Sequence, residues 1–383
     1  MAEIQAQALT EAPIYDMPYK KPDYLNESKR LDIDIIPESK DHNGVFLKLL
    51  GSPSISSKQW VYQQYDHMVQ TNTIVLPGSD AAVLRLKGTD KAIAATIDCN
   101  SSYCYLNPYL GAQIAVAEAA RNLVCSGAEP AALTDCLNFG NPEKPDRFWQ
   151  FKSCVEGIAY ACKFFEIPVV SGNVSFFNEN PNGAIYPTPA IGMIGIIDDL
   201  TKVCTQYFKK ENDIIILLGI CKEELGGSEY IKEMHGLAKG DAPDLDLQLE
   251  QAVQHTALEA IRKGLVSSAH DCSEGGLAVA LAECCISNRE GMIGAVIDKL
   301  TFDITKDALL FGESQSRIIL SCKEDFANEI RNIAARNSAP FQIIGQTCGK
   351  EFKIITGGKE IINLSLEKIA EKWAYSLESL ISA

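Results

Sequence analysis

Short apolar segments rich in β-branched residues alternate with longer segments of helical periodicity through most of this 383-residue chain. The strand-like segments are bounded by Gly, Asp or Pro and span residues 81–87, 92–98, 167–172, 191–197 and 214–219. Between them, residues 110–127 and 147–165 carry apolar side chains three and four positions apart, which is typical of helices with one buried face. Strands and helices that interleave in this way predict an α/β fold.

A polar stretch that begins near Asp199 interrupts this pattern and predicts a boundary between two units. We expect a first α/β domain over residues 41–200 and a second over residues 201–383, in line with about 150 residues per domain. The helices and strands expected in the second unit lie at 247–264, 276–287, 324–336 and 366–382, and near 316–321 and 352–356.

Residues 1–40 are polar and interrupted by proline, which predicts an extended lead-in. Two interpretations stay open for it. Tyr15, Tyr19 and Tyr24 lie along a neighbouring surface, or the segment is a linker exposed to solvent.

Composition excludes several classes of function. With 35 Lys and Arg against 50 Asp and Glu, the net charge is -15, which argues against nucleic-acid binding. No run of about 18 apolar residues occurs, so we expect no membrane span. The thirteen cysteines are scattered and form no C-x-x-C pair, and the first residues do not resemble a secretory signal. Reduced thiols in a cytoplasmic protein are the simplest interpretation.

Two polar segments contain the residues that are best suited to bind a ligand. In residues 169–180 an apolar strand is followed by Gly172, Asn173 and Ser175. Glycine allows a ligand to approach the backbone, the Asn amide oxygen suits a hard cation, and the Ser hydroxyl suits a phosphate or substrate oxygen. In residues 132–145 a second strand runs into Asp135, whose carboxylate can bind Mg²⁺, a ribose or an adenine amino group. Taken singly, the segment with Gly172 and Asn173 is better explained as a turn, and Asp135 could simply cap a helix or a turn. Together they predict an oxygen-rich rim at two strand ends, suited to a Mg-nucleotide.

Three further segments give weaker signals. Gly226 and Gly227 precede Ser228 at an expected helix start, which could bind a phosphate or simply cap the helix. His270 and Asp271 suggest acid–base chemistry, although Ser273 as a helix N-cap beside a satisfied histidine is the plainer interpretation. The triplet Glu313, Ser314 and Gln315 either contacts substrate or stabilises a turn ahead of a strand.

No Walker loop and no dinucleotide-binding glycine motif occurs in the chain. No Ser–His–Asp or Cys–His set can be assembled from sequence order alone.

These segments occur in the order found in one enzyme family. The run KAIAATIDCNSSYCYLNPYLGAQIAVAEAARNLVCSGAEPAALTDCLNFGNPEKP and the later SGNVSFFNE, LGGSEY, HDCSEGGLAVALAE and LFGESQSR resemble phosphoribosylformylglycinamidine synthases. More narrowly, the chain resembles the C-terminal half of the small-type synthetase subunit, from about Ala12 to the end.

This resemblance implies a fold and a reaction. The family belongs to the aminoimidazole ribonucleotide synthetase-like superfamily, in which a ferredoxin-like domain is followed by a second α/β domain. The implied reaction is the ATP-dependent amidation of formylglycinamide ribonucleotide, with Mg²⁺ as cofactor. The implied partners are the N-terminal half of the synthetase, a glutaminase subunit that supplies ammonia, and a small accessory subunit. On the matching positions, Asp135 and Gly172 would contact ATP, Asn173 would bind Mg²⁺, and Ser175 would contact the ribonucleotide.

The chain also departs from the family pattern. The catalytic histidines of the family lie in the N-terminal half, so we expect no catalytic residue here. Where that half has Lys, Glu and His, this chain has Thr96, Asp98 and Asn100. By analogy with larger members, an auxiliary nucleotide or phosphate could be contacted by Asp98, Asp271, Glu313, Ser314 and Gln315.

We therefore expect the chain to be inactive alone, as a natural split subunit or an excised fragment, and to form a homodimer when isolated. Two alternatives stay open. One is a free-standing homodimeric ATP-dependent synthetase of the same superfamily, and the other is a non-catalytic scaffold of a split synthase.

Overall fold

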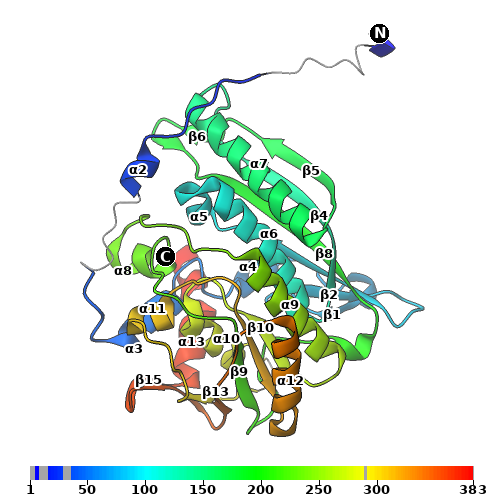
Figure 1. Ribbon diagram of the computed structural model, residues 1–383, viewed down its shortest axis with the longest axis vertical. Coiled ribbons are helices and arrows are strands. Elements are labelled where there is room, and N and C mark those ends of the chain that lie inside the picture. Colours follow the sequence, from blue (N-terminus) through cyan, green and yellow to red (C-terminus); the bar gives the residue numbers. More distant parts are fainter. Residues whose placement is uncertain (1–4, 8–15, 29–35, 289–290, 383) are drawn as a thin grey trace.

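Two β-sheets with their helices make up the protein in the computed structural model, which describes residues 5–7, 16–28, 36–288 and 291–382 (Figure 1). The first sheet has six strands and the second has seven, and a small two-stranded sheet joins β6 (Glu179–Asn180) to β7 (Gly183–Ala184). The interleaved α/β pattern expected from the sequence is confirmed. The division into residues 41–200 and 201–383 stays a prediction, and Phe46 and Leu49, which precede the first sheet, lie in the core of the second sheet.

The first sheet has the order β1-β2-β3-β8-β4-β5. Its strands are β1 (Thr73–Val75), β2 (Ala82–Arg85), β3 (Ala92–Asp98), β8 (Thr188–Ile197), β4 (Glu129–Asn138) and β5 (Val169–Ser175). Only the β4–β5 pair is parallel, and β5 forms one edge of the sheet.

Helices α5 (Ser101–Leu106), α6 (Pro108–Cys125) and α7 (Pro145–Phe165) accompany the first sheet, and α6 and α7 run side by side (Figure 1). The small residues of α6 allow this helix to be buried along nearly its whole length. A Cβ added at Gly157 of α7 would lie 3.2 Å from the Cβ of Ala112, so the two helices approach closely. One face of the sheet packs on this layer and forms a single core.

The other face of the first sheet is open and apolar. Side chains of Ile97 on β3 and of Ile194 and Ile196 on β8 lie on it, and Ile97 is 80% exposed. An antiparallel sheet with one buried face normally carries polar residues on the other. Apolar residues there indicate a surface suited to a partner.

The second sheet has the order β10-β12-β9-β13-β11-β14-β15. Its strands are β10 (Ser268–Asp271), β12 (Ile318–Cys322), β9 (Ile214–Leu218), β13 (Phe341–Thr347), β11 (Ala295–Ile297), β14 (Glu351–Thr356) and β15 (Lys359–Ser365). The apolar run of β9 serves two cores. Ile215 and Leu217 face one, and Ile214, Ile216 and Leu218 face the other, which explains why this strand shows no polar alternation.

Helix α2 (Tyr24–Ser28) contacts the first unit through Tyr24, whose hydroxyl donates to the carbonyl of Tyr105 at 2.8 Å. The other helices pack around the second sheet or at its edges. They are α3 (His42–Leu50), α4 (Gln59–Tyr62), α8 (Glu229–His235), α9 (Leu247–Arg262), α10 (Gly276–Ile286), α11 (Lys306–Phe311), α12 (Glu324–Asn337) and α13 (Leu366–Ile381). Short 3₁₀ turns occur at Val69–Thr71 and Leu200–Lys202.

Part of the lead-in contacts the first unit. The ring of Tyr24 stacks on that of Tyr105 with centroids 4.4 Å apart, and Lys152 lies over the ring of Tyr19. These contacts favour the interpretation in which the tyrosines follow a neighbouring surface. Tyr15 lies outside the described residues. Within the described part of the chain, no helix combines the length and the apolar character needed to cross a bilayer.

Candidate functional site

Asp135 and Gly172 are partners in the register of the parallel strands β4 and β5. The carboxylate of Asp135 lies over the backbone of Gly172, because a Cβ added at Gly172 would be only 2.8 Å from the carboxyl carbon of Asp135. Any other residue at position 172 would displace this carboxylate. Two segments that are 37 positions apart in the sequence, each with a predicted site residue, therefore meet at one edge of the sheet.

Asn173 is the next residue on β5 and is the register partner of Cys136. Successive strand residues point to opposite faces, so the side chains of Asp135 and Asn173 lie on opposite faces of the sheet. Asp135 shares its face with the buried Leu133 and Leu137, whereas Asn173 lies on the open face. The two side chains therefore do not converge from one face of the sheet, and what they share is the backbone of Gly172, which is the register partner of Asp135 and the chain neighbour of Asn173.

The expectation that both residues follow strand ends was wrong. Asp135 lies within β4 and Asn173 within β5, and both strands continue beyond them. The sequence suggested strand ends because polar residues interrupt the apolar runs. In the structure, those polar residues are tolerated inside strands because β5 is an exposed edge.

A hollow of about 350 Å³ lies on the open face at this position. Its lining is Ile97, Thr134, Asp135, Cys136, Ser171, Gly172, Asn173, Ala190 and Gly192. The hydroxyl groups of Thr134 and Ser171 are 2.7 Å apart and join the two strands across it. Three of the four residues predicted to contact ATP and Mg²⁺ or substrate therefore share one hollow.

Ser175, the fourth predicted residue, does not line that hollow but lies at the end of β5. The Asn178 amide donates to the Ser175 hydroxyl at 3.1 Å and to its carbonyl oxygen at 2.8 Å. These bonds fix the turn that follows the strand. Ser175 has the same strand parity as Asn173, so both side chains lie on the open face.

Among the residues that line the hollow, only Asp135 carries a carboxylate, and none is a Lys or Arg. Partial burial raises the pKa of the Asp135 carboxyl above its ordinary value. Within the described residues, no group of three or more His, Cys, Asp or Glu side chains is arranged to hold a metal ion. A Mg²⁺ ion at Asn173 would therefore need most of its oxygen ligands from a bound phosphate and from water, which is the usual manner of Mg²⁺ binding. The roles of Asp135, Gly172, Asn173 and Ser175 stay predictions.

The residues predicted for an auxiliary nucleotide lie elsewhere, in the buried contact between the two units. Arg121 of α6 is fully buried, and its guanidinium donates to Glu250 at 2.8 Å and to Gln315 at 2.9 Å, and pairs with Asp271 at 2.5 Å. Asp98 accepts from Asn122 at 3.5 Å beside this network. Burial raises the pKa of Asp98, with the nearby carboxylates Glu274 and Asp271 adding to the effect.

Glu313 and Ser314 are also buried, and they directly precede Gln315, which accepts from Arg121. The Glu313 carboxylate accepts from the hydroxyl of Tyr103 and from the backbone N–H groups of Gly275 at 2.8 Å and Glu229 at 2.9 Å. The Ser314 hydroxyl accepts from the Lys222 N–H. Protein groups thus occupy the polar atoms of this triplet, and its contact with an auxiliary nucleotide stays a prediction.

The weaker sequence signals have structural explanations. Ser228 is the N-cap of α8, as expected. Ser273 is not an N-cap, because α10 begins three residues later, at Gly276, and its N-cap is Gly275, whose φ is +79°. His270 lies between two carboxylates, Asp80 at 2.9 Å and Glu283 at 3.3 Å.

Sequence reasoning missed Asp80, Arg121 and Tyr103, which hold the two units together. Asp80 was missed because nothing about a loop aspartate signals a partner 190 positions away. Arg121 offered a signal that was not used. A lone arginine inside an otherwise small and apolar helical stretch requires a buried anionic partner.

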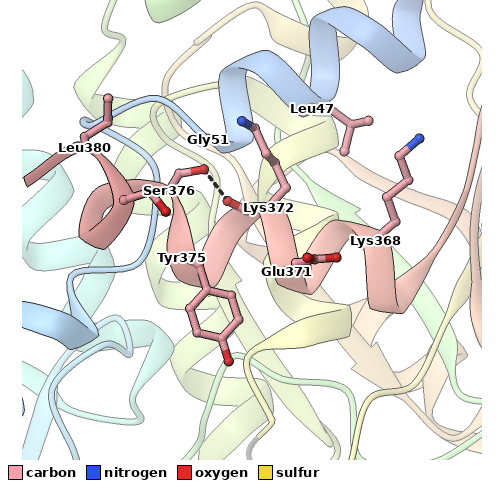
Figure 2. A pocket seen from close by; sticks show the side chains of 9 residues that line it. Leu47, Gly51, Lys368, Glu371, Lys372, Tyr375, Ser376 and Leu380 are labelled. Atoms are coloured by element: carbon pink, nitrogen blue, oxygen red, sulfur yellow. Dashed lines mark hydrogen bonds between the residues drawn. The ribbon is translucent and has the colours of Figure 1, made fainter. Parts of the chain in front are cut away.

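A larger groove of about 500 Å³ lies between α3 and α13, away from these residues. Figure 2 shows Lys368, Glu371, Lys372 and Tyr375 projecting from α13, with Leu47 of α3 and Gly51, which follows that helix, alongside. The Ser376 hydroxyl donates to the carbonyl of Lys372 at 2.6 Å. None of the predicted site residues lines this groove, so size alone does not identify the site.

Comparison with known proteins places this geometry in a family. The N-terminal domain model of AIR synthase related proteins matches residues 78–197, and the C-terminal domain model matches residues 210–357. Phosphoribosylformylglycinamidine synthase subunit PurL of Moorella thermoacetica is 47% identical over 383 residues, which is 100% of this chain and 52% of that protein.

The chain belongs to the AIR synthase related family. The PurL subunit of Caldanaerobacter subterraneus is a further relative of this AIR synthase related chain, with 50% identity over 97% of the chain and 50% of that subunit. A solved structure of T. maritima PurL complexed with FGAR has a TM-score of 0.73 at 18% identity, and the match covers 91% of this chain and 56% of that one. At this identity it confirms the fold. The chain spans about half the length of the curated PurL relatives it matches.

Proposed function

We propose that this chain is the C-terminal half of the synthetase subunit of phosphoribosylformylglycinamidine synthase, an ATP-dependent carbon–nitrogen ligase of purine biosynthesis. The observation that carries the proposal is the meeting of Asp135, Gly172 and Asn173 at one sheet edge, in a chain 47% identical to a PurL subunit. The solved PurL structures described as complexed with ATP and with FGAR support ATP and formylglycinamide ribonucleotide as ligands.

The proposed reaction needs an activated amide. An amide oxygen is a poor leaving group, so it first attacks the γ-phosphorus of ATP and ADP departs. Ammonia then adds to the activated carbon, and inorganic phosphate leaves to give the amidine. Catalysis of the first step consists of positioning and charge neutralisation of the phosphates.

Each of the four predicted site residues would make a contact that its position in the sheet allows. The backbone at Gly172 is open to a ligand from the edge of the sheet, and the neighbouring Asp135 carboxylate can accept from the ribose or the adenine amino group. The Asn173 amide oxygen faces the open side, where it would complete the coordination of a Mg²⁺ held chiefly by phosphate oxygens. Ser175, farther along the same face, would contact the ribonucleotide.

The open face of the first sheet supports the proposed partner. Ile97, Ile194 and Ile196 would pack against the N-terminal half of the synthetase, which would also supply the catalytic histidine. A glutaminase subunit would supply ammonia, and a small accessory subunit would complete the assembly, consistent with the solved structure described as PurLQS from Thermotoga maritima. With this function, the place of action is the cytoplasm.

Reconstitution tests this proposal. The purified chain is mixed with formylglycinamide ribonucleotide, ATP, Mg²⁺ and ammonia, with and without the N-terminal half, and amidine formation is measured. We expect turnover only in the mixture. Turnover by the chain alone would instead support a free-standing synthetase.

A scaffold role is tested in the same mixture. Replacing Asp135 by Ala should reduce turnover at least tenfold if this chain contributes to nucleotide binding. Undiminished turnover with this variant would indicate a non-catalytic scaffold.

A further inference from the structure

The hollow beside Asn173 exists because large side chains stop part-way along β8. Alternate residues of this strand lie on the open face of the first sheet, and two large ones are followed by two small ones: Ile196, Ile194, Gly192 and Ala190. The isoleucines are exposed, and the hollow of about 350 Å³ is lined by the two small residues. A partner that packs on the isoleucines would therefore cover the hollow and leave a cavity large enough for part of a ligand.

Thr134 has a fixed orientation in this hollow. It is the register partner of Gly192 on one side and of Ser171 on the other. A Cβ added at Gly192 would lie 3.0 Å from the methyl carbon of Thr134, so this methyl group lies over Gly192. Because the methyl and the hydroxyl share one Cβ, the hydroxyl is turned toward β5. There it lies 2.7 Å from the hydroxyl of Ser171.

The two hydroxyls form a polar pair that can bind a further group. One hydroxyl donates to the other, which leaves one hydroxyl hydrogen and several oxygen lone pairs for a ligand. Both residues are exposed and line the hollow. The described lining contains no Lys or Arg, so the pair suits a neutral polar group and not a phosphate.

Position along β5 indicates which part of a ligand the pair would contact. Ser171, Asn173 and Ser175 share one strand parity, with about 6–7 Å between successive members. The proposed function assigns the ribonucleotide to Ser175 and the metal-bound phosphates to Asn173. A nucleotide that extends from Asn173 in the direction away from Ser175 brings its ribose to Ser171.

We propose that the hydroxyls of Ser171 and Thr134 recognise the cis-diol of the ATP ribose, with Ser171 in contact and Thr134 as its positioning residue. This inference rests on the proposed function and adds a specificity-determining contact to the same site. Two neighbouring hydroxyls of the sugar match two of the protein, because each can both donate and accept. With the ribose on the open face, the base reaches the sheet edge at Gly172, which leaves its amino group for Asp135.

Calorimetric titration of the reconstituted pair of this chain and the N-terminal half tests the inference. The two probes are Mg-ATP and the Mg complex of its dideoxy analogue, which lacks both ribose hydroxyls. The wild type should bind ATP about tenfold more tightly than the analogue, as expected for hydrogen bonds to the diol. Ser171→Ala should weaken ATP binding about tenfold and leave binding of the analogue unchanged, so that the preference disappears.

Two variants test the positioning role of Thr134. Thr134→Val keeps the branched side chain over Gly192 but removes the hydroxyl, and it should reduce the preference for ATP about threefold. Thr134→Ser keeps the hydroxyl and should restore most of the preference. Ser379→Ala, at an exposed serine of α13, is the matched control and should equal the wild type. Circular dichroism shows that each variant folds.

Formylglycinamide ribonucleotide also carries a cis-diol, and its KM in the turnover assay separates the two sources of a ribose. This KM should be the same for Ser171→Ala and the wild type. A raised KM with an unchanged preference for ATP would assign the ribose of the ribonucleotide to Ser171 and overturn the proposal.

Three other results would overturn the inference. Ser171→Ala with the full preference of the wild type would remove the contact. An equal loss of affinity for ATP and the analogue in this variant would mean that the hydroxyl pair only stabilises the sheet, as cross-strand pairs of this kind do. A wild-type pair that binds both nucleotides equally would show that the diol is not recognised. Absence of any Mg-ATP binding would instead remove the proposed function, and this inference with it.

Discussion

The carboxylate of Asp135 lies in the space that a side chain on Gly172 would occupy. Gly172 is therefore required for two reasons: it leaves room for this carboxylate, and it leaves the backbone of edge strand β5 open to a ligand. The relationship makes position 172 the most sensitive single place in the proposed nucleotide site.

Replacing Gly172 by Ala should displace the Asp135 carboxylate and weaken Mg-ATP binding by the reconstituted pair about tenfold, or roughly 1.4 kcal/mol. The free energy of unfolding should change little, because β5 is exposed. Calorimetric titration measures the first quantity and urea denaturation the second. Gly291→Ala is the matched control, since a Cβ there meets nothing within 4 Å. Equal affinity in the Gly172→Ala variant and the wild type would remove Asp135 from the site.

The isolated chain should form a homodimer through the open face of the first sheet, because exposed apolar side chains there favour burial. Ile97→Lys places a charge at its most exposed isoleucine and should give a monomer in sedimentation velocity at about 10 μM. Val155→Lys, on the outer side of α7, should leave the dimer intact. A wild-type chain that sediments as a monomer would contradict this prediction.

The buried Arg121 network should be important for stability. Arg121→Met leaves Glu250 and Asp271 buried without their cation, and such a loss typically costs 3–5 kcal/mol. Urea denaturation of the variant should show a decrease of about this size. Arg336→Met, which removes an exposed pair with Glu259, should cost about 1 kcal/mol or less. A similar small effect for both variants would show that the network contributes little.

His270 should make stability depend on pH. Burial opposes its charge, but the carboxylates of Asp80 and Glu283 outweigh that effect and raise the pKa of His270 well above its ordinary value. A raised folded-state pKa stabilises the fold fully below about pH 6.5, the unfolded value, and this contribution is lost as the pH rises through the folded value. The neighbouring Asp271 also interacts electrostatically with His270.

His270→Gln should therefore lower the free energy of unfolding by about 3 kcal/mol at pH 6, and the difference from the wild type should shrink toward pH 10. Denaturation across this pH range measures it, with the exposed His235→Gln as the control. A difference that grows with pH would reverse the assigned sign.

Much of the fold follows from local pattern. The expected strand over 92–98 and helix over 147–165 correspond to β3 and α7 within two residues, because apolar periodicity there agrees with burial on one face. The short β11 and the edge strand β15 were not expected. β11 pairs with the distant strands β13 and β14, which periodicity does not report. β15 instead forms a hairpin with β14 across Gly357 and Gly358, a local turn signal that was not used.

Residue chemistry predicted which residues would form the candidate site, but not how they are arranged in space. Residue chemistry alone suggested that Asp135 and Asn173 belong together, and the β4–β5 register makes Asp135 the partner of Gly172, the residue before Asn173. The placement of the two side chains on opposite faces depends on this register, and no local pattern predicts the register between two strands. The hydrogen-bond partners of Glu313 could not be predicted from local sequence either, because Tyr103 is 210 positions away.

Mg-ATP affinity of the pair formed by this chain and the N-terminal half is the most direct test of the central claim, with Asn173→Ala compared with the wild type. The account predicts that Asn173→Ala weakens binding about tenfold in Mg²⁺ and leaves weak metal-free ATP binding unchanged, because the amide acts through the metal. The exposed Asn328→Ala should match the wild type in both conditions. Equal Mg-ATP affinity for Asn173→Ala and the wild type would contradict the claim that this sheet edge holds the metal-nucleotide.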